Sequence, residues 1–274
     1  MKVAFQGVRG AYSEQATRQF FPKQTPTFLP CEEFGGVFDA VLKGKAQAGV
    51  IPIENTLTGS IHQNFDLLRE RKVWIAGETR VRVSHNLIVQ PGVKKKDITR
   101  VLSHPQGLYQ CQKFLNRHRS WKQEPAFDTA GSVELLKNEN IRDGAAVAGK
   151  TAAEYYSMDI LAEAIEDNKQ NFTRFFLLRK TKRIERDANK TTLMFGLKDA
   201  PGVLFKALSV FAVRDLSLAK IESRPIHGKP WEYYFYADVI GCLRETAFQN
   251  AIRHLEELTT SVRVLGSYRA AEDK

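Results

Sequence analysis

The chain carries the stretch KDAPGVL at residues 198–204, and this stretch decides the fold of the C-terminal part. It joins an apolar run at 191–197, which predicts a strand, to an apolar run at 203–213, which predicts a helix. Asp199 is suited to cap that helix, and the Pro-Gly pair that follows it predicts a turn. Backbone N–H groups at such a helix N-terminus favour a carboxylate ligand.

The residues beyond this helix continue a regular order of elements. Two strands, a helix and a last strand are predicted at 217–225, 233–240, 245–258 and 262–268. The complete order is βαββαβ, which is the ferredoxin-like arrangement. A small domain of this kind next to a larger one suggests regulation or dimerisation.

The region before this domain has the pattern of an α/β protein, because short apolar runs alternate with amphipathic stretches. Strands are expected at 2–5, 48–53, 73–83, 86–89, 100–102, 145–148 and 175–178. Helices are expected at 13–20, 33–43, 60–71, 105–117, 132–138 and 152–156. Ser103 is suited to cap the fourth of these helices, and Asp128 or Thr129 the fifth. A charged stretch then predicts a linker, so the expected domains are 1–180 and 191–274, with the linker at 181–190.

Composition excludes several classes of protein. The chain has 274 residues, 43% hydrophobic and 26% charged, with a mean hydropathy of -0.35, which fits a globular protein with one or two cores. The apolar runs are too short to span a bilayer and the N-terminus lacks a secretory pattern, so we expect a cytoplasmic protein without a membrane partner. Three widely spaced cysteines predict neither a disulfide framework nor a zinc site.

The net charge of +10 favours anionic partners, such as nucleic acid, an acidic surface or a carboxylate-bearing metabolite. Two basic runs stand out, at 94–96 and 179–186. Neither alternates with aromatic residues, and neither repeats along a helix face. We therefore interpret them as a solvated turn and a linker, and expect no nucleic-acid partner.

Residues 144–151, GAAVAGKT, match the P-loop pattern G-x-x-x-x-G-K-[ST]. A P-loop needs a strand before its first glycine and a flexible phosphate loop between the glycines. Here the four residues between the glycines are apolar and predict the strand itself. The context therefore argues against nucleotide binding.

Polar residues follow three predicted strands, each just before a predicted helix. They lie at 7–14, 54–60 and 103–106. An open α/β sheet places its ligand at the carboxyl ends of its strands. One such turn is ordinary, but three together predict a ligand-binding pocket.

The remaining polar candidates allow more than one interpretation. His85 and His104 flank strands and are expected to be hydrogen-bonded structural residues, whereas His62 lies where it could reach a ligand. No histidine has metal-ligand spacing, and Cys111 is expected in the core. The stretch 171–175 could hold a carboxylate beside a hydroxyl, or could be a loop capped by its Asn and Thr.

Taken together, the separate phrases resemble prephenate dehydratases and their arogenate dehydratase relatives. The matching phrases are Gly10–Ser13, Pro52–Asn55, Ser103–Gln106, Asp128–Gly131 and Asn171–Phe175, in this order. The C-terminal part resembles the ACT regulatory domain of the same enzymes, at Gly202–Phe205 and Glu222–Pro225. The resemblance covers nearly the whole chain.

The resemblance implies a catalytic region of two α/β lobes, similar to a periplasmic-binding-protein fold, with the active site in the cleft between them. The implied reaction removes CO₂ and hydroxide from prephenate to give phenylpyruvate, or from arogenate to give phenylalanine. Aromatisation drives the reaction, so no cofactor and no metal is expected.

The resemblance also assigns residues. Thr173, Asn55 and Gln106 are the expected catalytic residues, with Thr173 hydrogen-bonding the departing hydroxyl and Arg174 adding positive charge. The expected substrate-binding residues are Thr56, Ser84, Ser103, Arg174 and Phe175. L-Phenylalanine is the expected effector, bound between ACT domains of a homodimer or homotetramer by Asp199, Gly202, Val203, Leu204, Glu222, Ser223, Arg224 and Pro225.

Two other functions remain open at this point. A two-lobed amino-acid sensor would bind ligand without chemistry, and a P-loop phosphotransferase would use Lys150. The choice between prephenate and arogenate also stays open.

Overall fold

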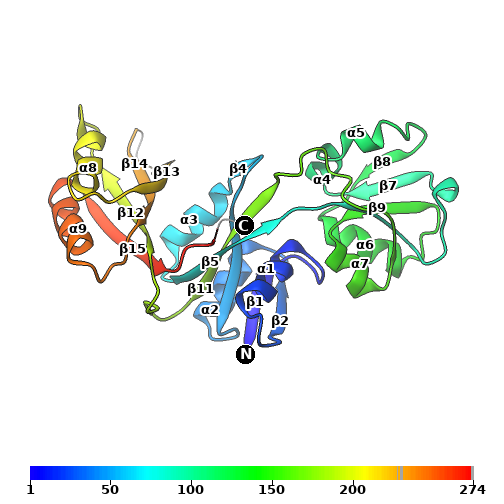
Figure 1. The fold of residues 1–274 in the computed structure, drawn as a ribbon, viewed down its shortest axis with the longest axis horizontal. Coiled ribbons are helices and arrows are strands. Elements are labelled where there is room, and N and C mark those ends of the chain that lie inside the picture. Colours follow the sequence, from blue (N-terminus) through cyan, green and yellow to red (C-terminus); the bar gives the residue numbers. More distant parts are fainter. Residues whose placement is uncertain (227, 229–230, 273–274) are drawn as a thin grey trace. The chain divides into compact units, whose positions relative to one another are not determined.

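The computed structural model describes residues 1–226, 228 and 231–272, and its elements are labelled in Figure 1. The chain forms two compact units. Unit 1 holds Met1–Val37, Val50–Ser60 and Arg80–Phe175, and unit 2 holds Phe38–Gly49, Ile61–Thr79 and the residues from Phe176 onward. No helix among the described residues combines the length and the apolar character needed to cross a membrane.

A sheet whose strands pass from unit 1 into unit 2 places the candidate catalytic residues. Its strands are β1 (Lys2–Gln6), β2 (Thr27–Cys31), β3 (Ala48–Asn55), β4 (Gly59–Ser60), β5 (Trp74–Arg82) and β11 (Phe172–Arg179). The order is β5-β11-β3-β1-β2, with β4 paired to β3. Helix α1 (Tyr12–Phe20) follows β1. β3 and β11 are therefore neighbours, which brings the phrases around residues 55 and 173 together.

The second sheet of unit 1 is covered on both faces. Its order is β10-β6-β9-β7-β8, with bounds Asp159–Ala162, Asn86–Val89, Gly144–Ala148, Arg100–Ser103 and Lys122–Pro125. Its helices are α4 (Pro105–Tyr109), α5 (Gln112–Leu115), α6 (Thr129–Asn138) and α7 (Lys150–Tyr156), with a 3₁₀ turn at Lys95–Asp97. In β9, Ala145 and Val147 face one core whereas Ala146 and Ala148 face another. Continuous apolar runs of this kind are typical of strands buried on both faces.

Unit 2 contains the predicted βαββαβ order. Its elements are β12 (Lys190–Leu197), α8 (Val203–Ala212), β13 (Leu218–Pro225), β14 (Tyr233–Ile240), α9 (Thr246–Leu258) and β15 (Ser261–Tyr268). The strand order is β13-β14-β12-β15, and both helices pack on one apolar core with Leu193 and Phe195 of β12. Helix α3 (His62–Glu70) also belongs to this unit, and α2 (Phe34–Leu42) crosses into it. The α/β class and the ferredoxin-like order are both confirmed.

β15 extends this sheet to β5, and the junction depends on a glycine. The two strands pair in parallel at Gly266 and Ile75. A Cβ at position 266 would lie 2.2 Å from the Ile75 carbonyl oxygen. Only glycine allows the two backbones to approach this closely.

Several local expectations are wrong. The predicted helix at 105–117 is two short helices, and its first cap is His104, whose Nδ1 accepts from the Gln106 backbone N–H. Asp199 does not cap α8, because Gly202 stands at the N-cap with a φ of 72°. Asp128 does cap α6, through the Gly131 N–H.

Candidate active site

Asn55 and Thr173 lie in contact where β3 ends and β11 begins. The Asn55 side-chain amide donates to the Thr173 hydroxyl Oγ1 at 3.0 Å and to Asn171 Oδ1 at 2.7 Å. Both Asn55 and Thr173 are nearly buried, with exposed fractions of 8% and 9%. The Thr173 oxygen is thus an acceptor in this pair, which leaves its own proton for another partner.

The carbonyl end of the Asn55 side chain fixes the loop that follows it. Asn55 Oδ1 accepts from the backbone N–H groups of Leu57 at 3.0 Å and Thr58 at 3.2 Å. Because both ends of this side chain are engaged, its orientation is fixed. Asn55 is therefore a rigid support for the Thr173 hydroxyl.

Asn171 is a polar residue of this cluster that sequence analysis placed only within a motif. Its side chain is fully buried, and its Nδ2 group has no hydrogen-bond partner among the described residues. A buried donor without a partner costs free energy, so it favours a ligand acceptor nearby. The signal in the sequence was its place two residues before Thr173, on the same face of an extended strand.

Arg174 lies on the other face of β11 from Thr173, because successive side chains of a strand alternate. Its Nε lies 3.4 Å from the Glu54 carboxylate, and Glu54 precedes Asn55 on β3. The ion pair offsets the charge of the guanidinium. The expectation that Arg174 gives the Thr173 pocket a positive field is therefore not supported by this arrangement.

Three predicted substrate-binding residues have structural contacts instead. The Ser103 hydroxyl is fully buried and donates to the Val147 carbonyl at 2.6 Å. The Thr56 hydroxyl donates to the Gln170 carbonyl at 2.9 Å and accepts from the Phe172 N–H at 3.0 Å. Phe175 is 2% exposed and lies in the core. Ser103 and Phe175 are thus enclosed by protein, whereas Thr56 is exposed and is held by its backbone contacts.

Ser84 lines a pocket of about 300 Å³ in unit 1. The other lining residues are Tyr12, Gln15, Arg82, Asn86, Lys150, Thr151, Glu154, Glu163 and Ala164. The pocket borders the candidate cluster, because the Val83 N–H next to Ser84 donates to the Asn171 carbonyl at 2.8 Å. It holds two cations and two carboxylates, so it offers partners for both signs of charge.

A hydrogen-bonded chain of buried groups lies beside this pocket. The Tyr12 hydroxyl donates to the Ser84 carbonyl at 2.7 Å and lies 3.2 Å from His85 Nδ1. His85 Nε2 lies 2.9 Å from Gln110 Oε1. Burial raises the pKa of the Tyr12 phenol and lowers the pKa of the His85 imidazole, so both are neutral near pH 7. The structural roles expected for His85 and His104 are confirmed.

Among the described residues, the Gln106 side chain forms no hydrogen bond with Asn55 or Thr173. Gln106 lies in the first turn of α4, and among the described residues its side chain has no hydrogen-bond partner. The P-loop interpretation fails as expected, because β9 occupies the residues between the two glycines and Lys150 begins α7.

The predicted effector residues of unit 2 fall into two groups. Asp199, Gly202, Val203 and Leu204 line a pocket of about 250 Å³ with Trp231, Tyr233 and Phe235. The second group lies on β13, the terminal strand of the sheet. There Arg224 donates to Asp66 of α3 at 2.7 Å, and Glu222 lies 3.3 Å from His62. The two motifs therefore do not share one pocket within the chain.

The family models divide the chain in the same order as the fold. The model of prephenate dehydratase matches residues 3–183, and the model of the ACT domain matches residues 191–257. An arogenate dehydratase/prephenate dehydratase of Arabidopsis thaliana, described as chloroplastic, is 44% identical and covers 98% of this chain and 72% of its own. An arogenate dehydratase of Petunia hybrida is 41% identical and covers 98% and 71%.

Two solved structures are similar over nearly the whole chain. A prephenate dehydratase from Arthrobacter aurescens, in complex with L-Phe, has a TM-score of 0.89 and 30% identity, covering 98% of this chain and 89% of its own. GqqA, described as a novel type of quorum quenching acylase, has a TM-score of 0.89 and 32% identity, covering 98% of both chains.

Proposed function

Because the chain belongs to the prephenate dehydratase family and carries an ACT domain, we propose that it converts prephenate to phenylpyruvate, or arogenate to phenylalanine. The reaction breaks the bond between the ring and its carboxylate, and the electrons of that bond enter the ring as CO₂ leaves. The C–O bond of the ring also breaks, and hydroxide departs with the electron pair of that bond. Hydroxide then takes a proton and becomes water.

The Asn55–Thr173 hydrogen bond carries this proposal. The amide donates to Thr173 Oγ1 at 3.0 Å, so the hydroxyl proton is free to point at the departing oxygen. A hydroxyl that accepts a hydrogen bond also becomes a better donor. Threonine is a weak acid, so its role is to stabilise developing negative charge, which is worth roughly 10²- to 10³-fold in rate.

We propose that the side chain of the substrate binds in the pocket that Ser84 lines. Lys150 and Arg82 can hold a carboxylate there, and Arg82 is itself held by Glu166 at 3.1 Å. Glu154 and Glu163 line the same pocket and suit an ammonium group. This mixture of charges fits the amino acid side chain of arogenate as well as the keto acid side chain of prephenate.

Purified protein given prephenate and arogenate separately, with the product identified in each case, tests the proposal. Thr173→Val keeps the shape and removes the hydroxyl, so it should lose about 10²- to 10³-fold in kcat. Thr173→Ser keeps the hydroxyl and should retain most of the activity. A folded Thr173→Val enzyme with nearly full turnover would remove Thr173 from the mechanism.

Feedback by L-phenylalanine through the ACT domain forms part of the same proposal. We assign catalysis to residues 1–180 and regulation to residues 191–274, with the effector between the 199–204 turn of one subunit and β13 of another. The position of β13 at the sheet edge supports such an arrangement. L-Phenylalanine should change substrate affinity by roughly 5- to 150-fold. Size-exclusion chromatography should give a homodimer or homotetramer, and a monomer would contradict the shared site.

Amide hydrolysis is the rival activity, since GqqA is described as an acylase. Acyl transfer by a hydroxyl nucleophile needs a general base in contact with it. Among the described residues, the Thr173 hydroxyl contacts the Asn55 amide and no imidazole or carboxylate. This favours the dehydratase. The cytoplasmic location expected from the sequence stays a prediction, because the Arabidopsis relative is described as chloroplastic.

A further inference from the structure

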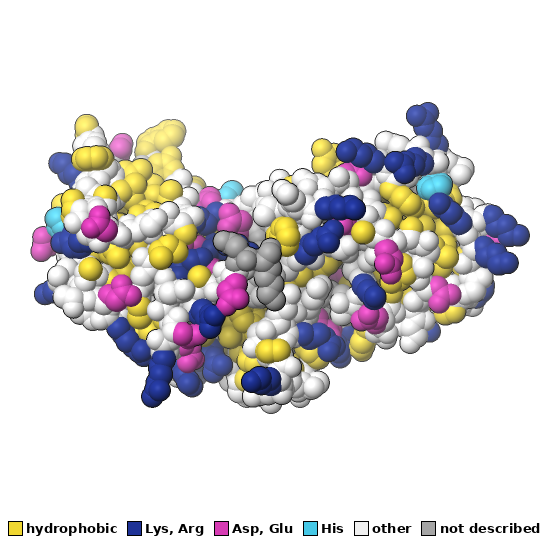
Figure 2. Space-filling view, viewed as in Figure 1, with side chains coloured by type: hydrophobic (Ala, Val, Ile, Leu, Met, Phe, Trp, Pro, Cys, Tyr) yellow, Lys and Arg dark blue, Asp and Glu magenta, His cyan; other side chains and the backbone are white. Residues whose placement is uncertain are grey.

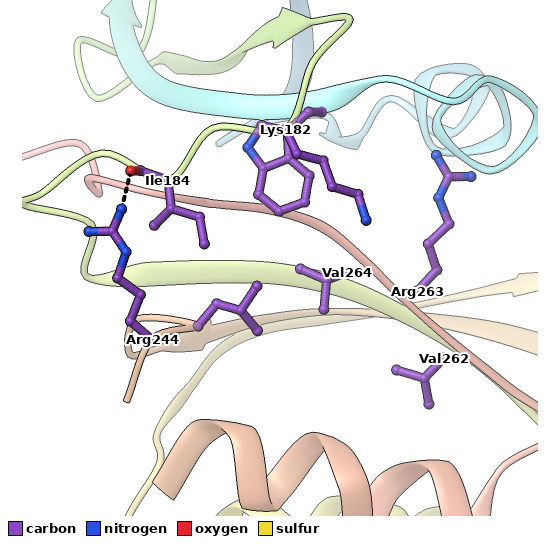
Figure 3. Close-up of a pocket in the computed structure, with 8 residues that line it drawn as sticks. Lys182, Ile184, Arg244, Val262, Arg263 and Val264 are labelled. Carbon is purple, nitrogen blue, oxygen red and sulfur yellow. Dashed lines mark hydrogen bonds between the residues drawn. The ribbon is translucent and has the colours of Figure 1, made fainter. Parts of the chain in front are cut away.

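A cavity of about 530 Å³ in unit 2 belongs to neither candidate site (Figure 3). It opens beside β15, near the point where this strand meets β5. Its lining residues are Trp74, Lys182, Ile184, Leu243, Arg244, Val262, Arg263 and Val264. Cavities that bind small molecules commonly measure about 300–1,000 Å³.

The wall of the cavity is largely apolar. Val262 and Val264 of β15 contribute methyl groups, as do Ile184 and Leu243. The Trp74 indole N–H donates to the Arg183 carbonyl at 2.8 Å, which fixes the orientation of the ring. A rigid aromatic ring beside branched side chains suits a flat or branched apolar ligand.

Three cations accompany this wall, and no carboxylate among the described residues pairs with them. Arg244 donates to the Ile184 carbonyl at 2.6 Å, as drawn in Figure 3. Arg263 donates to the carbonyls of Arg69 and Arg71 at 2.9 and 2.8 Å. The Lys182 ammonium lies 5.9 Å from the centre of the Trp74 ring. Neutral carbonyls orient these groups without offsetting their charge, so the cavity keeps a positive field.

On the face of the molecule shown in Figure 2, Lys and Arg side chains gather in several groups, with Asp and Glu among them. A small apolar cavity with uncompensated positive charge is complementary to one kind of ligand, an anion with an apolar body.

We propose that this cavity binds a small carboxylate with an aromatic or branched apolar body. The apolar body packs between Trp74 and Val264, and the carboxylate faces Lys182, whose ammonium lies beside the Trp74 ring (Figure 3). Because Trp74 adjoins Ile75 of β5 and Val264 lies two residues before Gly266 of β15, the ligand bridges the two strands at their junction. The site is separate from the pocket at the 199–204 turn and stands whether or not the dehydratase assignment holds.

Fluorescence of the full chain tests this proposal at the site itself. In a Trp121→Phe/Trp231→Phe background, Trp74 is the sole tryptophan of a chain that has three. Titration with 3-phenylpropionate should change its emission saturably. The amide of the same acid, 3-phenylpropionamide, should bind at least tenfold more weakly, since it lacks the charge.

Substitution of the cations provides the matched comparison. Lys182→Gln should weaken binding of 3-phenylpropionate at least tenfold. Lys180→Gln should leave it unchanged, because this exposed lysine does not line the cavity. Absence of a saturable signal, equal binding of acid and amide, or undiminished binding to Lys182→Gln would each overturn the proposal.

Discussion

The substitution Asn55→Asp tests whether the Asn55 amide directs the Thr173 hydroxyl proton toward the departing oxygen of the substrate. The Asn55 amide donates to Thr173 Oγ1 at 3.0 Å and to Asn171 Oδ1 at 2.7 Å. Aspartate has the same shape but, when ionised, donates nothing. The Thr173 proton would then turn to the new carboxylate and no longer reach the departing hydroxyl.

The size of the effect follows from the loss of one oriented donor. Removal of such a donor costs roughly 10²- to 10³-fold in kcat, or about 2.7–4 kcal/mol. The fold should survive, because the carboxylate can still accept from the N–H groups of Leu57 and Thr58. An unpaired buried acceptor costs about 1–3 kcal/mol, within the usual stability of about 5–15 kcal/mol.

The pH dependence distinguishes donor loss from distortion. Protonation of the carboxyl at position 55 restores an O–H donor toward Thr173, so kcat of the variant relative to wild type should rise as pH falls. Asn168→Asp is the matched control, since the Asn168 side chain is exposed and only accepts, from the Gln170 N–H. Turnover of Asn55→Asp within threefold of wild type at pH 7, or a deficit that does not change with pH, would refute the reasoning.

Other perturbations test stability and coupling. The Glu78–Lys190 ion pair is buried, with its N and O atoms 2.6 Å apart. Glu78→Gln should therefore lower the free energy of unfolding, measured by urea titration, by about 3–5 kcal/mol. A loss under about 1 kcal/mol would contradict this. Asp66→Asn removes the carboxylate that holds Arg224. It should change the coupling free energy between L-phenylalanine and substrate by about 0.5–2 kcal/mol without changing kcat in the absence of effector. An unaltered phenylalanine titration would contradict this expectation. Burial lowers the pKa of His85 below its usual 6.5, so the unfolded chain binds more protons in mild acid and stability falls as pH drops from 7 to 5. His85→Gln should flatten that slope, by at most about 1.4 kcal/mol per pH unit, and urea titrations at both pH values would show an unchanged slope if the reasoning were wrong.

Most central elements of the fold were predictable, and the three strands of at least four residues that were missed share a physical cause. β2, β8 and β10 all lie at the ends of their sheets. An edge strand is half exposed, so it lacks the continuous apolar run that marks a buried strand such as β9. β2 even contains Pro30, which is tolerated at an edge.

The break in the predicted helix at 105–117 depends on a distant residue. The Asp167 carboxylate accepts from the Lys113 N–H at 3.0 Å, and the Asp167 N–H donates to the Gln110 carbonyl at 2.7 Å. These bonds replace intrahelical ones at the join between α4 and α5. No local pattern in the sequence records such a contact.

The residues of the candidate site could be predicted from the sequence, but the separate role of each residue could not. Strand alternation alone separates Thr173 from Arg174, and this could have been derived from the sequence. The burial of the Ser103 hydroxyl against Val147 could not, because it depends on the pairing of β7 with β9. Motifs mark residues that a site needs, whereas packing decides which of them face the ligand.

The charged Arg174 lies on the opposite strand face from the neutral Asn55–Thr173 pair, and this separation has a chemical consequence. Decarboxylation moves the negative charge of the lost carboxylate into the ring, so a cation paired with that carboxylate would stabilise the substrate more than the transition state. The neutral Asn55 and Thr173 groups avoid this penalty, because Glu54 holds Arg174 on the opposite strand face. A cation is useful only at the carboxylate that remains in the product. By this reasoning the side chain of the substrate belongs near Lys150, and the ring hydroxyl belongs at Thr173.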